Sequence, residues 1–375
     1  MSKVKSLAIF NNKGGVGKST LTFHLAHALK EMNKKVLLVD LDPQCNLTLY
    51  GLEMERIHEI WEAEDAFINS PGFAESRKRI PEKDFDKLNG EVRTVHYLLK
   101  PIEEGTGELK ALPPPHKLEN GLDLLPGRLT LHMYEEKIAS RWSDIYRGDP
   151  LAIRTATGIR SLIEHYATIH GYDIALVDTS PSLGSLNKVA ISTVDSFLVP
   201  CLPDVFSLYG IRNIGASLSE WSNQFAIIHR LLSDEKRGLF PSEFVKFLGF
   251  TVYNARKYTG KPPWDLAQAH YNYAQQIPGT IEEFIPKSVR ADVPPEVLKK
   301  PVGETAVMHS HNTLPSMAQK YKCPIWKVPA HAPLDAEDQS TVSGNRMQYE
   351  ATRERYLEFA AAVLERLKAV FGDGK

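Results

Sequence analysis

The sequence predicts a single α/β domain over residues 1–375, with a mostly parallel, twisted β-sheet and helices on both faces. Short apolar runs recur along the chain and alternate with longer segments whose apolar residues follow helical spacing. Residues 36–39 and 174–177 are continuously hydrophobic, as strands buried on both faces of a parallel sheet are. The chain has 375 residues, of which 42% are hydrophobic, which is enough for one large α/β domain or two modest ones.

The net charge and the cysteine spacing limit which partners the protein can bind and in which cellular compartment we expect it. The net charge of −1 provides no global field toward nucleic acid or anionic membrane, so any such binding requires a local patch. Cys45, Cys201 and Cys323 are too widely spaced for a disulfide framework or a zinc site, which favours a reducing cytoplasm. We expect a cytoplasmic protein without a signal peptide or a membrane span, because no apolar run is long enough to cross a bilayer.

The first strand and the first helix flank a glycine-rich segment. Residues 7–10 read as a buried strand, residues 21–30 show helical spacing, and the sequence NNKGGVGKST lies at residues 11–20 between them. A glycine-rich turn in this place lets backbone N–H groups and the helix N-terminus face a phosphate. We expect Lys18 to reach the β- and γ-phosphates of a nucleotide, and the Ser19 hydroxyl to complete the coordination of Mg²⁺.

The motif departs from the P-loop pattern G-x-x-x-x-G-K-[ST] at its first glycine, which is Asn12 here, and it has an extra lysine, Lys13. This K-G-G-x-G-K-[ST] form resembles the deviant Walker A box of the ParA/MinD (Soj-like) family of P-loop ATPases, and in particular the ParA-type partition ATPases. The resemblance covers about residues 1–50, 120–255 and 323–370.

The resemblance implies a P-loop NTPase fold, ATP hydrolysis with ATP and Mg²⁺ as cofactors, and an ATP-dependent homodimer. In this dimer Lys13 of each subunit reaches the phosphates bound by its partner. The residues expected around the phosphates are Lys13, Gly14, Gly15, Val16, Gly17, Lys18, Ser19 and Thr20.

Two carboxylates follow the second strand, which we expect at residues 35–40. The segment DLDPQCN at residues 40–46 resembles the D-x-D-P-Q-x-N box of the same family, with Cys45 where relatives commonly have glycine. The resemblance places Asp40 in the outer shell of Mg²⁺ and gives Asp42 the task of orienting or activating the attacking water. The alternative for Asp42 is a helix N-cap after the strand.

A further strand, at residues 172–178, ends in Asp178, which is the Walker B arrangement. We expect Asp178 to hold Mg²⁺ directly or through a water, and the alternative is a cap on the next helix. The PSLG sequence at residues 181–184 resembles the switch II loop of the family, which senses the γ-phosphate. A strand at residues 121–125 and a helix at residues 151–169 precede this motif.

Strands at residues 196–201 and 246–254 and a helix at residues 208–232 complete the central part of the pattern. Asn254 stands where many relatives place the amide that reads the edge of adenine, and the alternative is a turn-forming Asn. We expect residues 323–329 to form the last strand and the loop containing Pro333 to close over the base. We expect the helix at residues 349–371 to pack on the domain rather than to bind a membrane.

Two segments depart from the family pattern and are predicted to be insertions. Residues 51–120 are rich in charge and proline, with helices expected at residues 53–68 and 92–99, and form a helical cap, a partner surface or a solvated decoration. Residues 257–322 are rich in proline and aromatic residues. This second segment includes a His-Ser-His sequence at residues 309–311, which lacks a further ligand at a spacing typical of metal sites, so we favour a loop or core role for it.

The resemblance leaves open what the switch controls. The first hypothesis is a partition ATPase that binds DNA nonspecifically, is associated with the nucleoid, and moves plasmid or chromosomal DNA with a ParB-like partner that stimulates hydrolysis. The alternative is a MinD-like or cargo-positioning ATPase scaffold that acts on protein or membrane. A third, an electron-transfer or metal-insertion relative, would need paired cysteines that the sequence lacks. The candidate DNA-binding residues, each of which has a solvated face as its alternative role, are Arg212, Arg230, Lys236, Arg237, Arg256, Lys257, Lys261, Lys287, Arg290, Lys299, Lys300, Arg346, Arg353 and Arg355.

Overall fold

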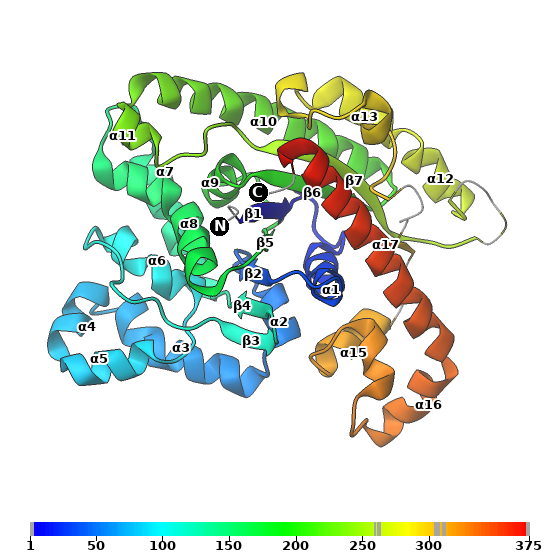
Figure 1. Ribbon diagram of the computed structural model, residues 1–375, viewed down its shortest axis with the longest axis horizontal. Helices are drawn as coiled ribbons and strands as arrows, with labels where there is room; N and C mark the ends of the chain where they lie inside the picture. The colour runs from blue at the N-terminus through cyan, green and yellow to red at the C-terminus, as the bar shows by residue number, and fades with distance from the viewer. Residues whose placement is uncertain (1–3, 259, 261–263, 304–307, 310–312, 373–375) are drawn as a thin grey trace.

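The computed structural model describes residues 4–258, 260, 264–303, 308–309 and 313–372. Its centre is an eight-stranded sheet in the order β3-β4-β2-β5-β1-β6-β7-β8 (Figure 1). All neighbouring strands are parallel except β3 and β4, which are antiparallel. The strands are β1 (Lys5–Ile9), β2 (Val36–Asp40), β3 (His116–Glu119), β4 (Leu122–Leu125), β5 (Ile174–Asp178), β6 (Ser196–Cys201), β7 (Lys246–Ala255) and β8 (Met308–His309).

Helices cover both faces of the sheet, as predicted (Figure 1). Those whose apolar residues pack mainly into the core on one face are α4 (Phe73–Arg79), α5 (Glu82–Asn89), α6 (Val95–Glu104), α7 (His132–Ile145), α8 (Pro150–His170), α9 (Ser185–Thr193), α10 (Val205–Leu231) and α13 (Ile277–Phe284). Those whose apolar residues pack mainly into the core on the other face are α1 (Lys18–Glu31), α2 (Asn46–Gly51), α15 (Leu314–Lys320), η3 (Ile325–Ala330), α16 (Ala336–Gly344) and α17 (Arg346–Phe371).

The remaining helices are shorter or lie between these layers. Helix α3 contributes apolar residues to both cores, Ile57 and Ile60 to one and Phe67 and Ile68 to the other. The remaining helices are α3 (Met54–Ile68), η1 (Leu129–Leu131), α11 (Asp234–Arg237), α12 (Gln268–Ala274), η2 (Lys287–Val289) and α14 (Pro295–Leu298).

The parallel register of the central strands positions the acidic side chains. Asp40 at the end of β2 is the neighbour of Asp178 at the end of β5, and Ile9 at the end of β1 is the neighbour of Asp178 on the other side. The chain leaves β1 directly into the glycine-rich loop that precedes α1. The predicted phosphate loop and the predicted acids therefore meet at the carboxyl edge of the sheet, where ligands bind in such folds.

The prediction that residues 323–329 form the last strand is wrong, because these residues form η3, a 3-10 helix. Ile325 and Val328 are both buried, and a spacing of three residues places both on one face of a 3-10 helix. Pro324 and Pro329 also lack the N–H groups that a strand ladder needs. The outer strand beside β7 is instead β8, and the opposite edge is the antiparallel β3; neither strand was predicted.

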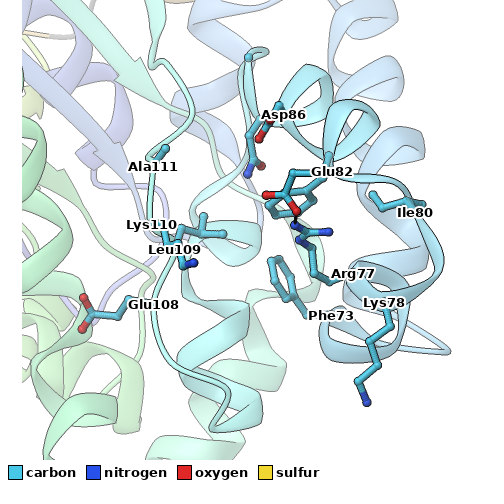
Figure 2. Close-up of a pocket in the computed structure, with 13 residues that line it drawn as sticks. Phe73, Arg77, Lys78, Ile80, Glu82, Asp86, Glu108, Leu109, Lys110 and Ala111 are labelled. Atoms are coloured by element: carbon cyan, nitrogen blue, oxygen red, sulfur yellow. Dashed lines mark hydrogen bonds and ion pairs between the residues drawn. The ribbon is translucent and has the colours of Figure 1, made fainter.

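The 51–120 segment holds the four helices α3 to α6 and strand β3. The predicted helix at residues 53–68 is confirmed as α3, and the one predicted at residues 92–99 corresponds to α6. A cavity of about 880 Å³ opens between α4, α5 and the connecting residues 108–111 (Figure 2). Its lining mixes aromatic and charged side chains and includes Phe73, Arg77, Glu82, Phe85 and Lys110.

Helix α17 packs on the domain, as predicted, since Tyr356, Phe359 and Val363 are buried and the helix lies against α1. The segment at residues 257–322 holds α12, α13, η2, α14, β8 and α15. Among the described residues, no helix has the length and the apolar character that a membrane crossing requires.

Candidate active site

The glycine-rich loop takes a shape that only glycine tolerates at two positions. Gly15 and Gly17 have φ angles of 73° and 80°, in the left-handed region that disfavours residues with a Cβ atom. At Gly17 a Cβ atom would also overlap the ring of Tyr253 on β7. Gly14 and Gly15 are exposed, and nothing lies within 4 Å of the places where their Cβ atoms would be. The loop is therefore open on the side where its backbone can approach a phosphate.

Lys18 begins α1 and lies under this loop. Its side chain is 7% exposed, and its ammonium group donates to the backbone oxygen of Lys13 at 3.3 Å. Burial lowers the pKa of Lys18, against the attraction of Asp178 and Asp42, which raises it. The lysine therefore faces two carboxylates and a single carbonyl oxygen, and a bound phosphate would add a strong acceptor for its donors.

Asp40 is buried and is already engaged by protein groups. Its Oδ2 accepts from the backbone N–H and the hydroxyl of Thr48 at 2.8 and 2.6 Å, and its Oδ1 accepts from the backbone N–H of Asp42 at 3.1 Å. Burial raises the pKa of Asp40 to about 7, although these hydrogen bonds lower it. Because Asp40 accepts from the backbone N–H of Asp42, it fixes the loop that carries Asp42. The Thr48 hydroxyl in turn accepts from the backbone N–H of Gly127 at 2.7 Å.

Asp42 is buried in the same loop, before α2. Its carboxylate accepts from the backbone N–H of Gln44 at 2.9 Å, and its backbone oxygen accepts from the N–H of Cys45. The residue before α2 is Cys45, so the alternative role of Asp42 as the N-cap of the next helix is not the one it has in the structure. One oxygen of Asp42 is used in the turn, and the other has no hydrogen bond among the described residues.

Asp178 at the end of β5 is completely buried, and neither of its oxygens has a hydrogen-bond partner in the described structure. The Ser19 hydroxyl lies close to Asp178 and lowers the pKa of this carboxyl group, but the two groups do not have the geometry of a hydrogen bond. Burial, and then the charge of Asp40, raise the pKa of Asp178 well above its usual range. A buried carboxylate without partners is costly unless a cation compensates it, so Asp178 and the Ser19 hydroxyl fit a Mg²⁺ site. No group of three or more His, Cys, Asp or Glu side chains that could hold a metal ion occurs in the part of the chain that is described.

The loop after Asp178, at residues 180–184, is held from α9. The side-chain amide of Asn187 donates to the backbone oxygens of Ser180 and Ser182, both at 2.8 Å. The hydroxyl groups of the same two serines lie 3.0 Å apart. This loop, which the sequence relates to switch II, therefore has a defined shape in the structure.

Lys13 lies at the outer rim of the site. Its ammonium group forms an ion pair with Asp204 at the start of α10 and lies 5.7 Å from the centre of the Phe206 ring. The carboxylate of Asp204 also accepts from the backbone N–H of Ser207 at 2.9 Å, so it caps α10. The predicted phosphate loop is thereby tied to the exposed first turn of α10.

The two predicted base-binding residues, Asn254 and Pro333, both have exposed side chains. Asn254 is exposed at the end of β7 with a φ angle of 57°, and Pro333 is exposed in the connection between η3 and α16. Their contacts with adenine stay predictions. His309 lies in β8, whereas the other two residues of the His-Ser-His sequence, 310 and 311, lie outside the described residues. The three cysteines are free thiols, as expected.

Three residues that shape the site were not singled out in the sequence. Thr48 holds Asp40, Asn187 holds the loop after Asp178, and Asp204 holds Lys13. Only Asp204 had a readable signal, because an Asp three residues before a Ser at the start of an apolar helix is typical of an N-cap. Thr48 and Asn187 act over 8 and 5–7 positions along the chain, through loops whose shape the sequence does not show.

Comparison with known families agrees with this geometry. Residues 4–227, more than half of the chain, match a family model described as an AAA domain (AAA_31). The chain belongs to this family, the ParA-like P-loop ATPases. It is thus an ATPase with an α/β fold, as the sequence predicted.

The relatives of this ParA-like ATPase include the chromosome-partitioning ATPase Soj of Thermus thermophilus. The two chains are 26% identical over 312 residues, which cover 82% of this chain and 90% of Soj. Other curated relatives are 25–28% identical, and the chain spans 49–68% of their lengths.

Solved structures show the same fold over almost the whole chain. A protein from Corynebacterium diphtheriae is 22% identical with a TM-score of 0.63, covering 98% of this chain and 99% of that one. The structure of pNOB8 ParA bound to nonspecific DNA is 19% identical with a TM-score of 0.54, covering 97% and 99%. At these identities the likeness shows the fold alone.

Proposed function

We propose that this ParA-like ATPase is an ATP-dependent, dimerising switch that binds DNA nonspecifically and positions or segregates plasmid or chromosomal DNA with a ParB-like partner. The observation that carries the proposal is the surface around Lys13. Phe206, in the first turn of α10, is 67% exposed beside this lysine, and Tyr209, three residues further along the helix, is 59% exposed. Large aromatic side chains next to a charged residue at the mouth of a site fit a protein interface. We infer that a second copy of the chain covers this surface.

The site residues would divide the chemistry as follows. Residues 14–20 hold the phosphates of ATP, and Lys18 and the partner's Lys13 offset the charge that develops on the γ-phosphate. Ser19 and Asp178 hold Mg²⁺, and Asp40 fixes the loop that carries Asp42. Asp42 uses its second oxygen to orient a water for in-line attack on the γ-phosphate. Mg²⁺ supplies positive charge to the phosphate oxygens when it is bound.

Some of the candidate DNA-binding side chains are bonded within the fold, and we therefore favour others for contacts with DNA. Arg290 donates to three backbone oxygens at the end of α13, and Lys236 donates to the backbone oxygen of Gly148, so these side chains support the fold. Lys261 lies outside the described residues. Arg256 and Lys257 are exposed directly after β7, at the carboxyl edge of the sheet where the site lies, and neither side chain has a described ion pair. We place the first DNA contacts at this pair.

The dimer is tested with the Asp42→Ala variant and ATP. Because the variant keeps the phosphate loop but loses the group that orients water, we expect it to bind ATP and to stay dimeric in light scattering. Wild-type protein with ADP, which lacks the γ-phosphate, should be monomeric. A monomeric Asp42→Ala protein in saturating ATP would overturn the proposed switch.

The DNA role is tested by binding of the trapped dimer to a random duplex at several salt concentrations. The logarithm of the affinity should fall linearly with the logarithm of the salt concentration. Replacing Arg256 and Lys257 by Ala should lower the affinity and reduce the slope by about two. Replacing the exposed Lys83 and Lys87 of α5 by Ala removes the same charge elsewhere and should change neither. Absence of salt-sensitive binding, together with ATP-dependent flotation on anionic liposomes, would favour the cargo-positioning alternative.

A further inference from the structure

We propose that Glu135 of α7 positions the loop that follows Asp178, and that α7 thereby couples this loop to the 51–120 segment. The loop at residues 180–184 leaves β5 directly after the predicted Mg²⁺ ligand and leads into α9. Glu135 does not reach the phosphate loop in any described contact, so it is a positioning residue. The inference rests on the ATPase activity of the family and is independent of the DNA role.

The contact between α7 and the loop is specific to one carboxylate. Glu135 accepts a hydrogen bond from the backbone N–H of Leu186 in the first turn of α9, at 3.2 Å. A Cβ atom on Gly184 would overlap the same carboxylate oxygen of Glu135. Gly184 has a φ angle of −75°, which residues with a side chain adopt freely. The backbone conformation at residue 184 therefore does not require glycine. Glycine is needed there because the Glu135 carboxylate occupies the place of a side chain.

The other half of α7 holds the end of α6. The guanidinium group of Arg141 donates to the backbone oxygens of Ile102 and Glu103 at 3.2 and 2.8 Å, and to the hydroxyl of Thr155 at 3.0 Å. These oxygens belong to the last turn of α6, where carbonyl groups lack helical partners. Arg141 and Glu135 lie on the same rigid helix, so α7 bonds the 51–120 segment at one place and the loop after Asp178 at another.

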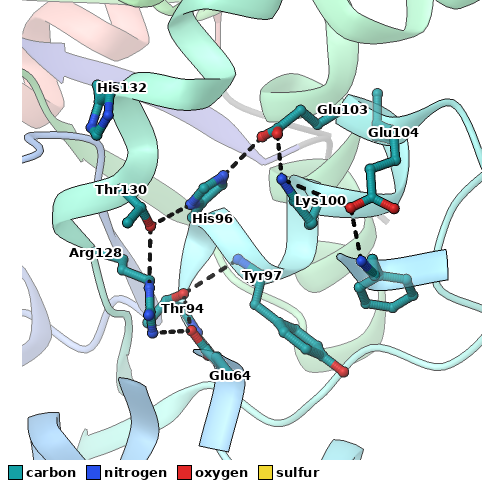
Figure 3. Close-up of polar contacts among 12 residues, drawn as sticks. Glu64, Thr94, His96, Tyr97, Lys100, Glu103, Glu104, Arg128, Thr130 and His132 are labelled. Atoms are coloured by element: carbon teal, nitrogen blue, oxygen red, sulfur yellow. Dashed lines mark hydrogen bonds and ion pairs between the residues drawn. The ribbon is translucent and has the colours of Figure 1, made fainter. Parts of the chain in front are cut away.

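Helix α6 is bonded in turn to its neighbours α3 and α4 in the 51–120 segment, and Figure 3 shows the polar contacts around it. The carboxylate of Glu104 at its end accepts from the backbone N–H groups of Phe73 and Ala74 at the start of α4, at 2.8 and 3.0 Å. At its other end, Glu64 of α3 accepts from the backbone N–H of Thr94 at 2.7 Å. Phe73 also lines the cavity between α4 and α5 (Figure 2). A continuous set of hydrogen bonds therefore runs from the wall of this cavity through α6 and α7 to the loop.

The proposal is tested first by hydrogen exchange of the peptide that covers residues 180–188, in the absence of nucleotide. Glu135→Ala should speed the exchange of the Leu186 amide about tenfold, the factor expected for a lost hydrogen bond to a carboxylate. Glu135→Gln retains an acceptor oxygen and should keep the exchange near that of the wild type. Glu136→Ala changes the next, exposed residue of the same helix and is the matched control.

A double-mutant cycle separates this contact from a general loss of packing. Gly184→Ala should speed the same exchange in the wild-type background, because the new methyl group displaces the Glu135 carboxylate. In the Glu135→Ala background that overlap is gone, so Gly184→Ala should have little additional effect. Additive effects of the two substitutions, or equal effects of Glu135→Ala and Glu135→Gln, would overturn the positioning role.

The coupling to the 51–120 segment is tested with Arg141→Lys, which keeps the charge but loses the forked contact with α6. Exchange should rise both at the end of α6 and at residues 180–188, and the kcat for ATP should change more than the KM. Arg147→Ala, at an exposed arginine just beyond α7, should change none of these. If exchange rises at α6 alone while the loop and kcat stay as in the wild type, α7 does not couple the two.

Discussion

The ammonium group of Lys13 forms an ion pair with the carboxylate of Asp204 in the same subunit. Partial burial raises the pKa of Asp204, but the hydrogen bonds from Lys13 and Ser207 outweigh burial, so the pKa lies below its usual range and the carboxylate is charged near neutral pH. In the proposed dimer Lys13 contacts the phosphates of the partner. The lysine must therefore leave Asp204 before the dimer can close.

This competition predicts that Asp204→Asn promotes dimerisation. The amide keeps an oxygen that can accept from the N–H of Ser207 and cap α10, but it no longer binds the lysine as an ion pair. A partly exposed ion pair contributes on the order of 1 kcal/mol, so the ATP concentration at half-maximal dimerisation should fall about fivefold. Light scattering over a series of ATP concentrations measures this. An unchanged midpoint would mean that Asp204 does not restrain Lys13.

Lys18 provides the second prediction, since its ammonium group lies between the loop and two carboxylates. Lys18→Ala removes the positive charge and leaves Asp42 and Asp178 facing the incoming phosphates. We expect loss of nucleotide binding, by at least about a hundredfold, because a charge-assisted contact is replaced by repulsion. Binding of a fluorescent ATP analogue measures the effect, and Lys34→Ala, on the surface beyond α1, is the control. Retained binding would contradict the assigned role of Lys18.

The third prediction concerns Asp178, whose oxygens have no hydrogen-bond partner among the described residues. A substitution there should weaken Mg²⁺ binding without lowering the stability of the nucleotide-free protein. Asp178→Asn removes a buried carboxylate whose oxygens have no hydrogen-bond partner among the described residues, so we expect the nucleotide-free variant to melt no lower than the wild type. In the wild type, Mg²⁺ with ATP at about a hundred times the Kd should add about 2.7 kcal/mol of stability. EDTA should remove the part of this gain that depends on Mg²⁺. The Asp178→Asn variant should lack most of that Mg²⁺-dependent part even without EDTA.

Thermal unfolding with ATP and either Mg²⁺ or EDTA measures both effects. Asp84→Asn, an exposed substitution on α5, should behave as the wild type. A variant that still gains stability from Mg²⁺ would show that the ion is held without Asp178.

The sequence predicted the fold where the signal was local. Continuous apolar runs identified the strands that end in Asp40 and Asp178, and their order along a parallel sheet placed both acids beside the phosphate loop. The loop itself was predictable because positive φ angles at Gly15 and Gly17 leave few other residues possible.

The errors arose where a local pattern had two solutions. The spacing of Ile325 and Val328 is compatible with a short irregular strand as well as with a 3-10 helix. These residues form a helix, η3, that packs against α17 and α15. Strand β8 has only two residues, Met308 and His309, so no periodicity could reveal it. The contact of Glu135 with Leu186 joins residues 51 positions apart and depends on how α7 packs on α9.

Glu119 on the unpredicted strand β3 gives the last prediction, which concerns pH. Its carboxylate lies 3.0 Å from Nδ1 of His27 and 2.7 Å from the ammonium group of Lys30, both on α1, and it also pairs with Lys327 of η3. The close contact with the His27 ring, together with the ion pairs to the two lysines, holds the pKa of Glu119 well below its usual range. Since the folded state binds the proton less tightly than the unfolded state, the group stabilises the fold above about pH 4.5 and loses this effect as the pH falls.

We therefore expect Glu119→Gln to lower the free energy of unfolding by about 1 kcal/mol at pH 7, allowing for solvent screening of this half-buried group. The difference from the wild type should shrink as the pH is lowered from 5 toward 3, because Glu119 then takes up a proton in the unfolded wild-type chain while it stays charged in the folded protein. Urea unfolding at each pH measures the difference, with the exposed Glu62→Gln as the control. A difference that stays constant down to pH 3 would mean that Glu119 acts through packing rather than through its charge.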